Sequence, residues 1–423
     1  MESLRQYLCI DLKSFYASVE CVERGLDPIS TKLCVCDLER SEKTICLAIS
    51  PAMKALGIKN RCRVFEIPPH IEYIAAVPRM QLYIDYAAKI YNIYLSFVSK
   101  EDIHVYSIDE AFLDVTNYLN LYQLSARELG CKIMEEIHSK LGLIATCGIG
   151  TNLYLAKIAL DISAKHTSDF LGELTEDSYK ATLWDYKPLT DFWMIGHGIA
   201  KQLEAIGVTT MRDIANTPED TLYHMFGVNA ELLIDHAYGI EPTTINDIKN
   251  YKSKTNSISS GQVLSCDYNF EKGLLIVKEM CDLLCLDLVE KGLVTKSITL
   301  HIGYSNRLGL PPAHGTTSLI EESSSDLLII PAVTELYKRI IDKQSPIRRV
   351  TLTFNNVIPE EYIQYSFLLN AEDLEKNRKV QNAVIDIKNK FGKNAILKGM
   401  NLQEGATTMK RNLQIGGHKS GQV

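Results

Sequence analysis

The sequence lacks the features of a membrane or secreted protein. No stretch of its 423 residues approaches the ~18 consecutive apolar residues that a membrane helix needs. The N-terminal "MESLRQYLCIDL" has an early acidic residue and no long apolar run, which is not the pattern of a signal peptide. The eleven cysteines are an odd number without framework spacing, and many lie in apolar runs, as reduced core residues do. We therefore expect a cytoplasmic protein.

Several catalytic signatures are also absent. There is no Walker-type phosphate loop, no G-x-S-x-G elbow and no zinc-protease His pair. The pair Cys34-x-Cys36 resembles half of a zinc site, but no second pair or His cluster has ligand spacing. We expect no structural metal there.

Positive charge is scarce except at one end of the chain. The formal net charge is −7, yet the residues from Lys376 to Val423 carry ten Lys or Arg against two acids, which leaves −15 on the rest. A basic tail on an acidic body can contact phosphate backbones, and a simply solvated polar tail is the alternative. Charge alone does not decide between them.

The chain is otherwise an ordinary globular one, with 46% hydrophobic and 23% charged residues and the length of two to four domains. Its first 165 residues predict strand, helix, strand, strand, helix, strand and a final helix, with an insertion between about 27 and 79. Ser14 is a candidate N-cap of the first helix. This order predicts a ferredoxin-like sheet with helices on one face.

Adjacent acids interrupt a strand-like run in "HVYSIDEAFLDVT", residues 104–116. The predicted topology places Asp109 and Glu110 in a central hairpin turn, beside Asp11 at the end of the first strand. Three carboxylates without a nearby His or Cys suit Mg²⁺, and two such ions can support phosphoryl or nucleotidyl transfer. The alternative is a solvated hairpin turn.

Four segments, taken together, resemble the Y-family translesion DNA polymerases, in their bacterial UmuC/ImpB-like branch. They occur in the family's order and spacing and read "CIDLKSFYASVE" (9–20), "SIDEAFLDVT" (107–116), "CGIGTNLYLAKIA" (147–159) and "FWMIGHGIAKQLEAIGV" (192–208). The resemblance covers residues 5–355. It implies an α+β right-hand polymerase with a ferredoxin-like palm (1–26 and 80–170), small fingers (27–79), a helix-hairpin-helix thumb (171–245), a linker (246–260), an α/β little finger (261–357) and a basic, mobile C-terminal tail (358–423).

The resemblance also implies residue roles. Asp11, Asp109 and Glu110, with the backbone carbonyl of Leu12, are expected to hold two Mg²⁺ ions. Tyr16, next to Phe15, corresponds to the steric gate against a ribose 2′-hydroxyl. The expected nucleotide contacts are Lys54 and Lys165, and the expected DNA contacts of the thumb turn are Ile195, Gly196, Gly198 and Lys201.

Some positions depart from the family pattern. Pro51 stands where many relatives have Tyr, and Lys54 replaces a common Arg. Lys165 follows Lys157 by eight positions, one more than is usual. The peptide "QYSFLL" (364–369) resembles a sliding-clamp motif through Gln364, Phe367 and Leu368, although its Phe-Leu order is reversed; a final strand or helix start is the alternative.

We therefore expect error-prone, template-directed DNA synthesis past damage, as in a DNA damage or SOS response, with primer-template DNA and dNTP as substrates. A sliding clamp and a UmuD-like accessory protein are the expected protein partners, and no membrane is involved. A nucleotide cyclase would share the carboxylates without the DNA-gripping thumb turn. A DNA-binding mutasome scaffold would require a lost carboxylate, and none is lost. The expected location is the bacterial cytoplasm, in association with the nucleoid.

Overall fold

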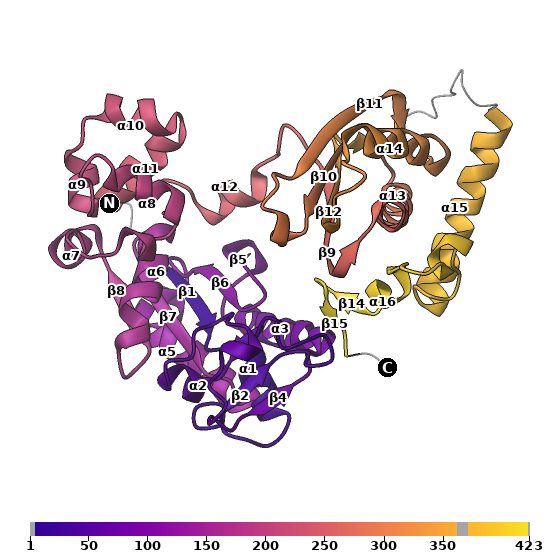
Figure 1. Ribbon diagram of the computed structural model, residues 1–423. Helices are drawn as coiled ribbons and strands as arrows, with labels where there is room; N and C mark the ends of the chain where they lie inside the picture. Colours follow the sequence, from indigo (N-terminus) through magenta and orange to yellow (C-terminus); the bar gives the residue numbers. More distant parts are fainter. Residues whose placement is uncertain (1–4, 362–370, 422–423) are drawn as a thin grey trace. The chain divides into compact units, whose positions relative to one another are not determined.

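The computed structural model describes residues 5–361 and 371–421 (Figure 1). The chain divides into two compact units, Met1–Tyr251 and Lys252–Val423. Within the described ranges, no helix is both long and apolar enough to cross a bilayer.

The first unit is organised around a five-stranded sheet of order β5-β6-β1-β7-β8. β1 (Tyr7–Leu12) pairs antiparallel with β6 (Glu110–Asp114) and β7 (Ala145–Gly150), while β5 (Ile103–Val105) pairs antiparallel with β6. Those four strands have the predicted ferredoxin-like order, and β8 (Leu171–Leu174) extends the sheet parallel to β7. The predicted α+β fold class is confirmed.

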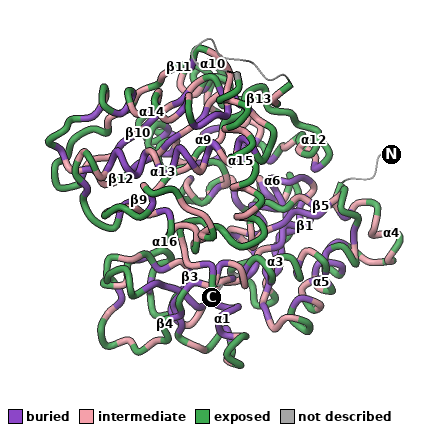
Figure 2. The backbone as a smooth tube through the Cα atoms, turned by 90° about the vertical axis from the view of Figure 1, so that its right-hand side faces the viewer, coloured by how far each residue is buried: buried purple, intermediate pink, exposed green. Residues whose placement is uncertain are grey.

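Helices cover both faces of this sheet, not one face as predicted. The principal helices are α1 (Phe15–Val22), α3 (Met80–Leu95), α5 (Ala126–Leu141) and α6 (Leu153–Ile158). Tyr7 and Cys9 of β1 pack in one core with Leu153 of α6, whereas Leu8 faces Gly130 of α5. β1 is buried along its length except at Asp11, which is partly buried (Figure 2). A strand covered on both faces loses the alternation of apolar and polar residues.

Two glycines let α6 lie directly on β7. A Cβ atom at Gly148 would stand 2.1 Å from the carbonyl oxygen of Ala156, and one at Gly150 would stand 2.2 Å from the amide nitrogen of the same residue. No side chain fits in that space, so the "CGIG" part of the third motif is required by packing. The close approach fixes α6, and with it Lys157, against the sheet.

The insertion between α1 and α3 forms its own small sheet of order β3-β2-β4, from β2 (Leu33–Val35), β3 (Ala48–Ile49) and β4 (Ile74–Ala76). Helix α2 (Pro51–Ala55) begins with Pro51 at a position that tolerates a missing N–H. This insertion covers the residues for which the family resemblance implies small fingers.

A helical region follows the palm sheet. Its helices are α7 (Glu176–Thr182), α8 (His197–Glu204), α9 (Met211–Asn216), α10 (Glu219–Phe226), α11 (Asn229–Tyr238) and α12 (Ile245–Asn250). Helix α12 occupies the start of the predicted 246–260 linker and packs Ile245 into the palm core. The connection between the units is therefore shorter than predicted, because β9 already begins at Ile258.

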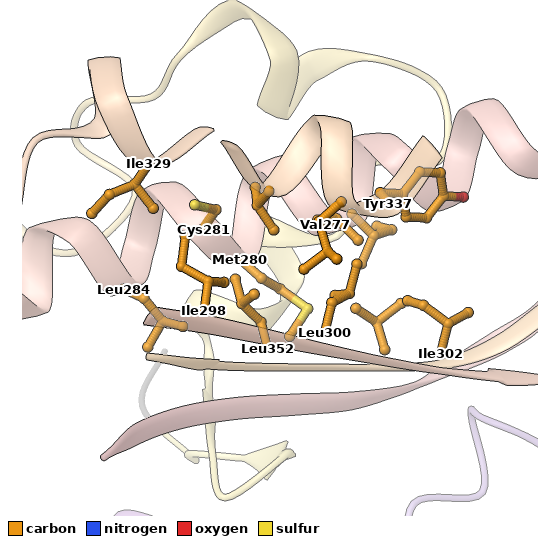
Figure 3. Packing of buried hydrophobic residues seen from close by; sticks show 14 of the residues in the cluster. Val277, Met280, Cys281, Leu284, Ile298, Leu300, Ile302, Ile329, Tyr337 and Leu352 are labelled. Atoms are coloured by element: carbon orange, nitrogen blue, oxygen red, sulfur yellow. The ribbon is translucent and has the colours of Figure 1, made fainter. Parts of the chain in front are cut away.

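The second unit has a four-stranded antiparallel sheet of order β11-β10-β12-β9. Its elements are β9 (Ile258–Tyr268), α13 (Phe270–Glu290), β10 (Leu293–Tyr304), β11 (Ala313–Ser323), α14 (Asp326–Ile340) and β12 (Ile347–Asn355). Figure 3 shows how Met280 of α13 and Leu300 of β10 meet in its core. The other face of the sheet carries polar side chains.

The C-terminal residues are folded, which corrects the expectation of a mobile tail. Residues 371–421 form α15 (Ala371–Phe391), α16 (Thr408–Asn412) and a hairpin of β14 (Gln414–Ile415) and β15 (His418–Lys419). Asn401 donates to the carboxylate of Glu279 on α13 at 2.9 Å. Buried partners on α13 and α14 therefore hold a segment whose sequence is polar and basic.

Candidate active site

The palm sheet brings the three predicted carboxylate residues to one place. Asp11 lies directly opposite Glu110 in the β1–β6 register, and the amide of Leu12 donates to the carbonyl of Asp109 at 3.0 Å. Asp109 lies in the turn before β6, where its side chain accepts a hydrogen bond from Ser107 at 2.7 Å. Glu110 is the first residue of β6 and not part of the turn. Two adjacent strands thus fix the positions of all three residues.

The surroundings of Asp11 disfavour the ionised form of its carboxyl group. Burial, with Asp109 and Glu110 nearby, raises the pKa of Asp11 to about 7, and Lys165 opposes the rise. The charged form of this carboxyl is disfavoured, chiefly by burial and further by the two neighbouring carboxylates. The site would therefore gain from a bound cation.

Glu110 forms an ion pair with Lys157, a residue that was not predicted from the sequence to belong to the site. The ammonium of Lys157 lies 2.8 Å from Oε1 of Glu110, and the two side chains are 9% and 10% exposed. The thiol of Cys9 adds a hydrogen bond to the same oxygen at 3.2 Å. Burial alone would lower the pKa of Lys157, but Cys9, Asp161 and Glu110 together raise it, so the ammonium stays charged.

Asp161 links Lys157 of α6 to Lys165, which lies in a 3-10 turn (Ala164–His166) beyond the end of that helix. Asp161 lies 3.1 Å from the ammonium of Lys157 and 2.8 Å from that of Lys165. Between them the helix turns into a π-helix over Ala159–Ser163. A π-turn takes in more residues than an α-turn, which accommodates the extra residue between the two lysines. Lys165 thereby lies close enough to Asp11 to influence its pKa.

These residues fit a hard divalent cation by their donor chemistry. Asp11 and Asp109 supply carboxylate oxygens, the ligands that Mg²⁺ prefers, and the raised pKa of Asp11 marks the negative charge that such an ion would balance. In the part of the chain that the structure describes, no three His, Cys, Asp or Glu side chains are already placed to hold a metal together. The carboxylate of Glu110 is instead held by Lys157.

Tyr16 stacks on a second tyrosine. Its ring lies 4.5 Å from the ring of Tyr83 on α3, with 16° between the planes. The hydroxyl of Tyr83 donates to the buried carboxylate of Glu20 at 2.7 Å, and Arg79 binds that carboxylate through two hydrogen bonds of 2.8 and 3.0 Å. Phe15 is 2% exposed and packs in the core. Burial and Asp109 raise the pKa of Tyr16, so its ring lies near the carboxylates.

Ser14 precedes these rings in a left-handed backbone conformation, with φ of 52°. It stands at the predicted N-cap position of α1, but its side chain makes no capping hydrogen bond. The chain therefore turns sharply between the metal-ligand candidates of β1 and the aromatic pair, which is the kind of local strain found at functional sites.

Lys54 of α2 also lies near the carboxylates. Burial lowers the pKa of Lys54, Asp11 opposes that effect, and Lys165 and Lys13 add to it. The mutual influence places the two predicted phosphate ligands, Lys54 and Lys165, close to each other and to Asp11.

The predicted thumb turn precedes α8, with Gly196 at its N-cap position. A Cβ atom at Gly196 or Gly198 would meet nothing within 4 Å, so the chain's own packing does not require these glycines. Ile195 is 4% exposed and belongs to the thumb core, whereas Lys201 is exposed. Of the four predicted contact residues, Gly196, Gly198 and Lys201 are exposed to a ligand and Ile195 is not. The clamp-like residues Gln364, Phe367 and Leu368 lie outside the described residues.

A ferredoxin-like sheet with clustered carboxylates, a finger-like insertion, a helical thumb and a separate α/β unit define a right-hand polymerase of the Y-family type. Residues 10–161 match the impB/mucB/samB family and residues 255–367 match its C-terminal domain. The chain belongs to this family, the Y-family translesion polymerases.

Two curated relatives match nearly the whole chain. The UV-damage repair protein UvrX of Bacillus subtilis is 30% identical over 98% of both chains. DNA polymerase IV 2 of Halalkalibacterium halodurans is 28% identical over 97% of this chain and 98% of its own. A solved Y-family DNA polymerase chimera of Dbh and Dpo4 segments shares the fold, with a TM-score of 0.66 and 21% identity over 84% of this chain and 99% of its own.

Proposed function

We propose that Asp11, Asp109 and Glu110 carry the nucleotidyl transfer of this chain, which is a DNA-directed DNA polymerase that synthesises past damage. The observation that carries the proposal is the pairing of Asp11 with Glu110 across β1 and β6, with Asp109 joined to Leu12 through the backbone. In this reaction the 3′-hydroxyl of the primer attacks the α-phosphate of a dNTP, and pyrophosphate leaves.

Asp11, Asp109, Glu110 and the carbonyl of Leu12 would hold two Mg²⁺ ions. The ions supply positive charge that lowers the pKa of the attacking hydroxyl and stabilises the leaving phosphate. The protein's own part is positioning: β1 and β6 fix the acids, Lys157 keeps Glu110 in place, and Lys54 with Lys165 neutralises the triphosphate. To act as a metal ligand, Glu110 would have to give up part of its contact with Lys157.

Tyr16 would select the sugar. Its ring, held by the stack on Tyr83, would clash with a ribose 2′-hydroxyl, so deoxynucleotides would bind better. The backbone amides of the Gly196–Gly198 turn, with Lys201, would hold a DNA phosphate without reading sequence.

The partners proposed beyond DNA and dNTP are a sliding clamp, bound through Gln364, Phe367 and Leu368, and a UmuD-like accessory protein. The support for the clamp is the peptide's sequence alone. Contacts with DNA and with the clamp would place the protein at the bacterial nucleoid. Pull-down of purified clamp by the wild-type chain and by a Gln364→Ala/Phe367→Ala variant tests this part, and equal retention by both would refute it.

Primer extension by the purified chain tests the active site. The assay contains a primed template, dNTPs and Mg²⁺, and compares the wild type with Asp11→Asn/Asp109→Asn. Asp114→Asn, on the far end of β6, is the matched control. Extension should vanish in the double variant and persist in the control. Full extension by the double variant would refute the assignment, and absence of extension by the wild type with intact DNA binding would favour a scaffold that needs a partner.

A further inference from the structure

The segment after the little finger has a fold but no assigned role. The match to the family's C-terminal domain ends at residue 367, while residues 371–421 continue as α15, α16 and the β14–β15 hairpin. Its charge is strongly positive in a chain that is otherwise acidic.

The segment is held rigidly on α13. Glu279 is 1% exposed, and its carboxylate accepts hydrogen bonds from Nδ2 of Asn401 at 2.9 Å and from the amide of Thr407 at 2.8 Å. The ammonium of Lys398 lies 2.6 Å from Asp282. In the described residues, the hydrogen bonds to the Glu279 carboxylate come from this segment. Because a buried carboxylate needs such partners, the segment is fixed to the core of the second unit.

Three of its cations form a group, here named the C-terminal cation cluster: Lys393, Lys410 and Arg411. Two side-chain hydrogen bonds join the loop after α15 to α16, from Asn412 to the carbonyl of Lys393 at 3.2 Å and from Asn394 to the carbonyl of Met409 at 3.1 Å. These bonds hold the backbone at Lys393 against α16, the helix that carries Lys410 and Arg411, although the two lysines are 17 positions apart in the sequence.

The cluster's charges are not neutralised within the described chain. Arg378, Lys379 and Lys398 of the same segment each make an ion pair, whereas none is found for the three cluster residues in the described ranges. The guanidinium of Arg411 faces only neutral oxygens of β9, Oγ of Ser260 at 3.3 Å and the carbonyl of Gly261 at 3.5 Å. Burial lowers the pKa of Arg411, and Glu279 opposes that effect from farther away.

We propose that the C-terminal cation cluster binds the phosphate backbone of DNA, as a contact additional to the thumb turn. The proposal rests on the chain's function as a DNA polymerase. A half-buried guanidinium without a carboxylate partner suits a phosphate, which it can bind through two parallel hydrogen bonds, and the two lysines add point charges. Arg411 touches β9, an edge strand of the little-finger sheet, so a bound backbone would run along that edge. Such contacts carry no base readout, so the contribution is independent of sequence.

The test is the salt dependence of DNA binding by the full chain. Binding of a fluorescent primer-template is measured by anisotropy over a salt series for the wild type and for Lys393→Gln/Lys410→Gln/Arg411→Gln. The control, Lys338→Gln/Lys376→Gln/Lys379→Gln, removes the same charge from other exposed positions of the second unit.

Each lost phosphate contact lowers the slope of log K against log salt by about 0.9, which is roughly eightfold in affinity at 0.1 M salt. The cluster variant should therefore lose up to about 2.7 in slope, and the control should lose little. The double variant Lys393→Gln/Lys410→Gln keeps the contact of Arg411 with β9, so it keeps the fold and should show about two thirds of the effect.

Two results would overturn the proposal. An equal loss in the cluster and control variants would mean that only overall charge matters. Unchanged binding in the cluster variant would assign the cluster to another anion, such as an acidic protein surface. At saturating DNA the cluster variant should extend primers at the wild-type rate, whereas Asp11→Asn should bind DNA normally without extension, so failures of the two assignments are distinguishable.

Discussion

Replacing Lys157 with Met should destabilise the first unit strongly, because it leaves Glu110 charged and without a cationic partner. The two side chains are each about nine-tenths buried and 2.8 Å apart. Removing one member of a buried pair costs about 3–5 kcal/mol. For a unit of this size that corresponds to a fall in melting temperature of roughly 6–20 °C.

The second partner of Lys157 contributes less to this cost. Asp161 is 23% exposed and keeps its ion pair with Lys165 at 2.8 Å after the substitution. Lys165→Met is therefore the matched control: it removes a lysine from the same helix, but one with a 44% exposed side chain. An exposed pair of this kind contributes up to about 1 kcal/mol.

Tryptophan fluorescence measures this effect in the right unit. The two tryptophans, Trp184 and Trp193, both lie in the first unit, and the indole of Trp193 donates to the hydroxyl of Tyr106 at 3.1 Å beside the palm core. Urea unfolding followed at these residues gives the free energy for the wild type, Lys157→Met, Glu110→Gln and the double variant. The double variant should be more stable than the sum of the two single effects predicts, because it leaves no buried charge.

Two results would refute the reasoning. If Lys157→Met lies within about 1 kcal/mol of the wild type, the Lys157–Glu110 pair is not buried as the structure has it. If the single effects simply add in the double variant, the two side chains do not interact.

Three further predictions concern other parts of the chain. Tyr83→Leu removes the ring behind Tyr16 and should raise ribonucleotide incorporation several-fold in a dNTP/rNTP competition assay, and an unchanged ratio would exclude a positioning role. Burial alone would raise the pKa of Glu20, but hydrogen bonds from Arg79, Arg24 and Tyr83 lower it. The ionised carboxylate therefore stabilises the fold fully above the ordinary pKa of a Glu, and this stabilisation is lost as the pH falls through the lowered pKa of Glu20. Glu20→Gln should flatten the acid limb of the stability–pH curve, and identical curves for the variant and the wild type would contradict this. Lys398→Met should weaken the docking of the C-terminal segment by roughly 1–2 kcal/mol and speed hydrogen exchange across residues 401–412, and unchanged exchange would count against the anchor.

The sequence was enough to predict the palm, because its strands and helices follow one another in the ferredoxin-like order and each is marked by a clear apolar pattern. It was not enough to predict that both faces of the sheet are covered. β1 is buried on both sides, so its residues carry no alternation from which a solvent face could be recognised. The proximity of Asp11 to Asp109 and Glu110 was predicted from topology alone, whereas Glu110, expected in the hairpin turn, is the first residue of β6.

The C-terminal segment was mispredicted for a physical reason. α15 is polar and its apolar stripe is weak, which is the pattern of a solvated tail. The C-terminal segment as a whole is held by charged residues of other elements. These are chiefly the carboxylates of α13 and α14 that bind Lys398, Asn401 and Thr407. Interactions between residues 72 to 128 positions apart leave no local signal in the sequence.

The extra residue between Lys157 and Lys165 shows how a local irregularity can preserve a site. Counted along an α-helix, eight positions would place Lys165 farther round the helix than the usual spacing does, which made it a weak candidate from sequence. The π-turn over Ala159–Ser163 takes up that residue, and Asp161 then bridges both lysines. One lysine pairs with Glu110, while the other remains near Asp11, whose pKa is raised chiefly by burial and further by Asp109 and Glu110. The helical segment from Leu153 to His166 therefore carries a buried lysine, Lys157, that holds Glu110, and a more exposed lysine, Lys165, that can meet an incoming phosphate.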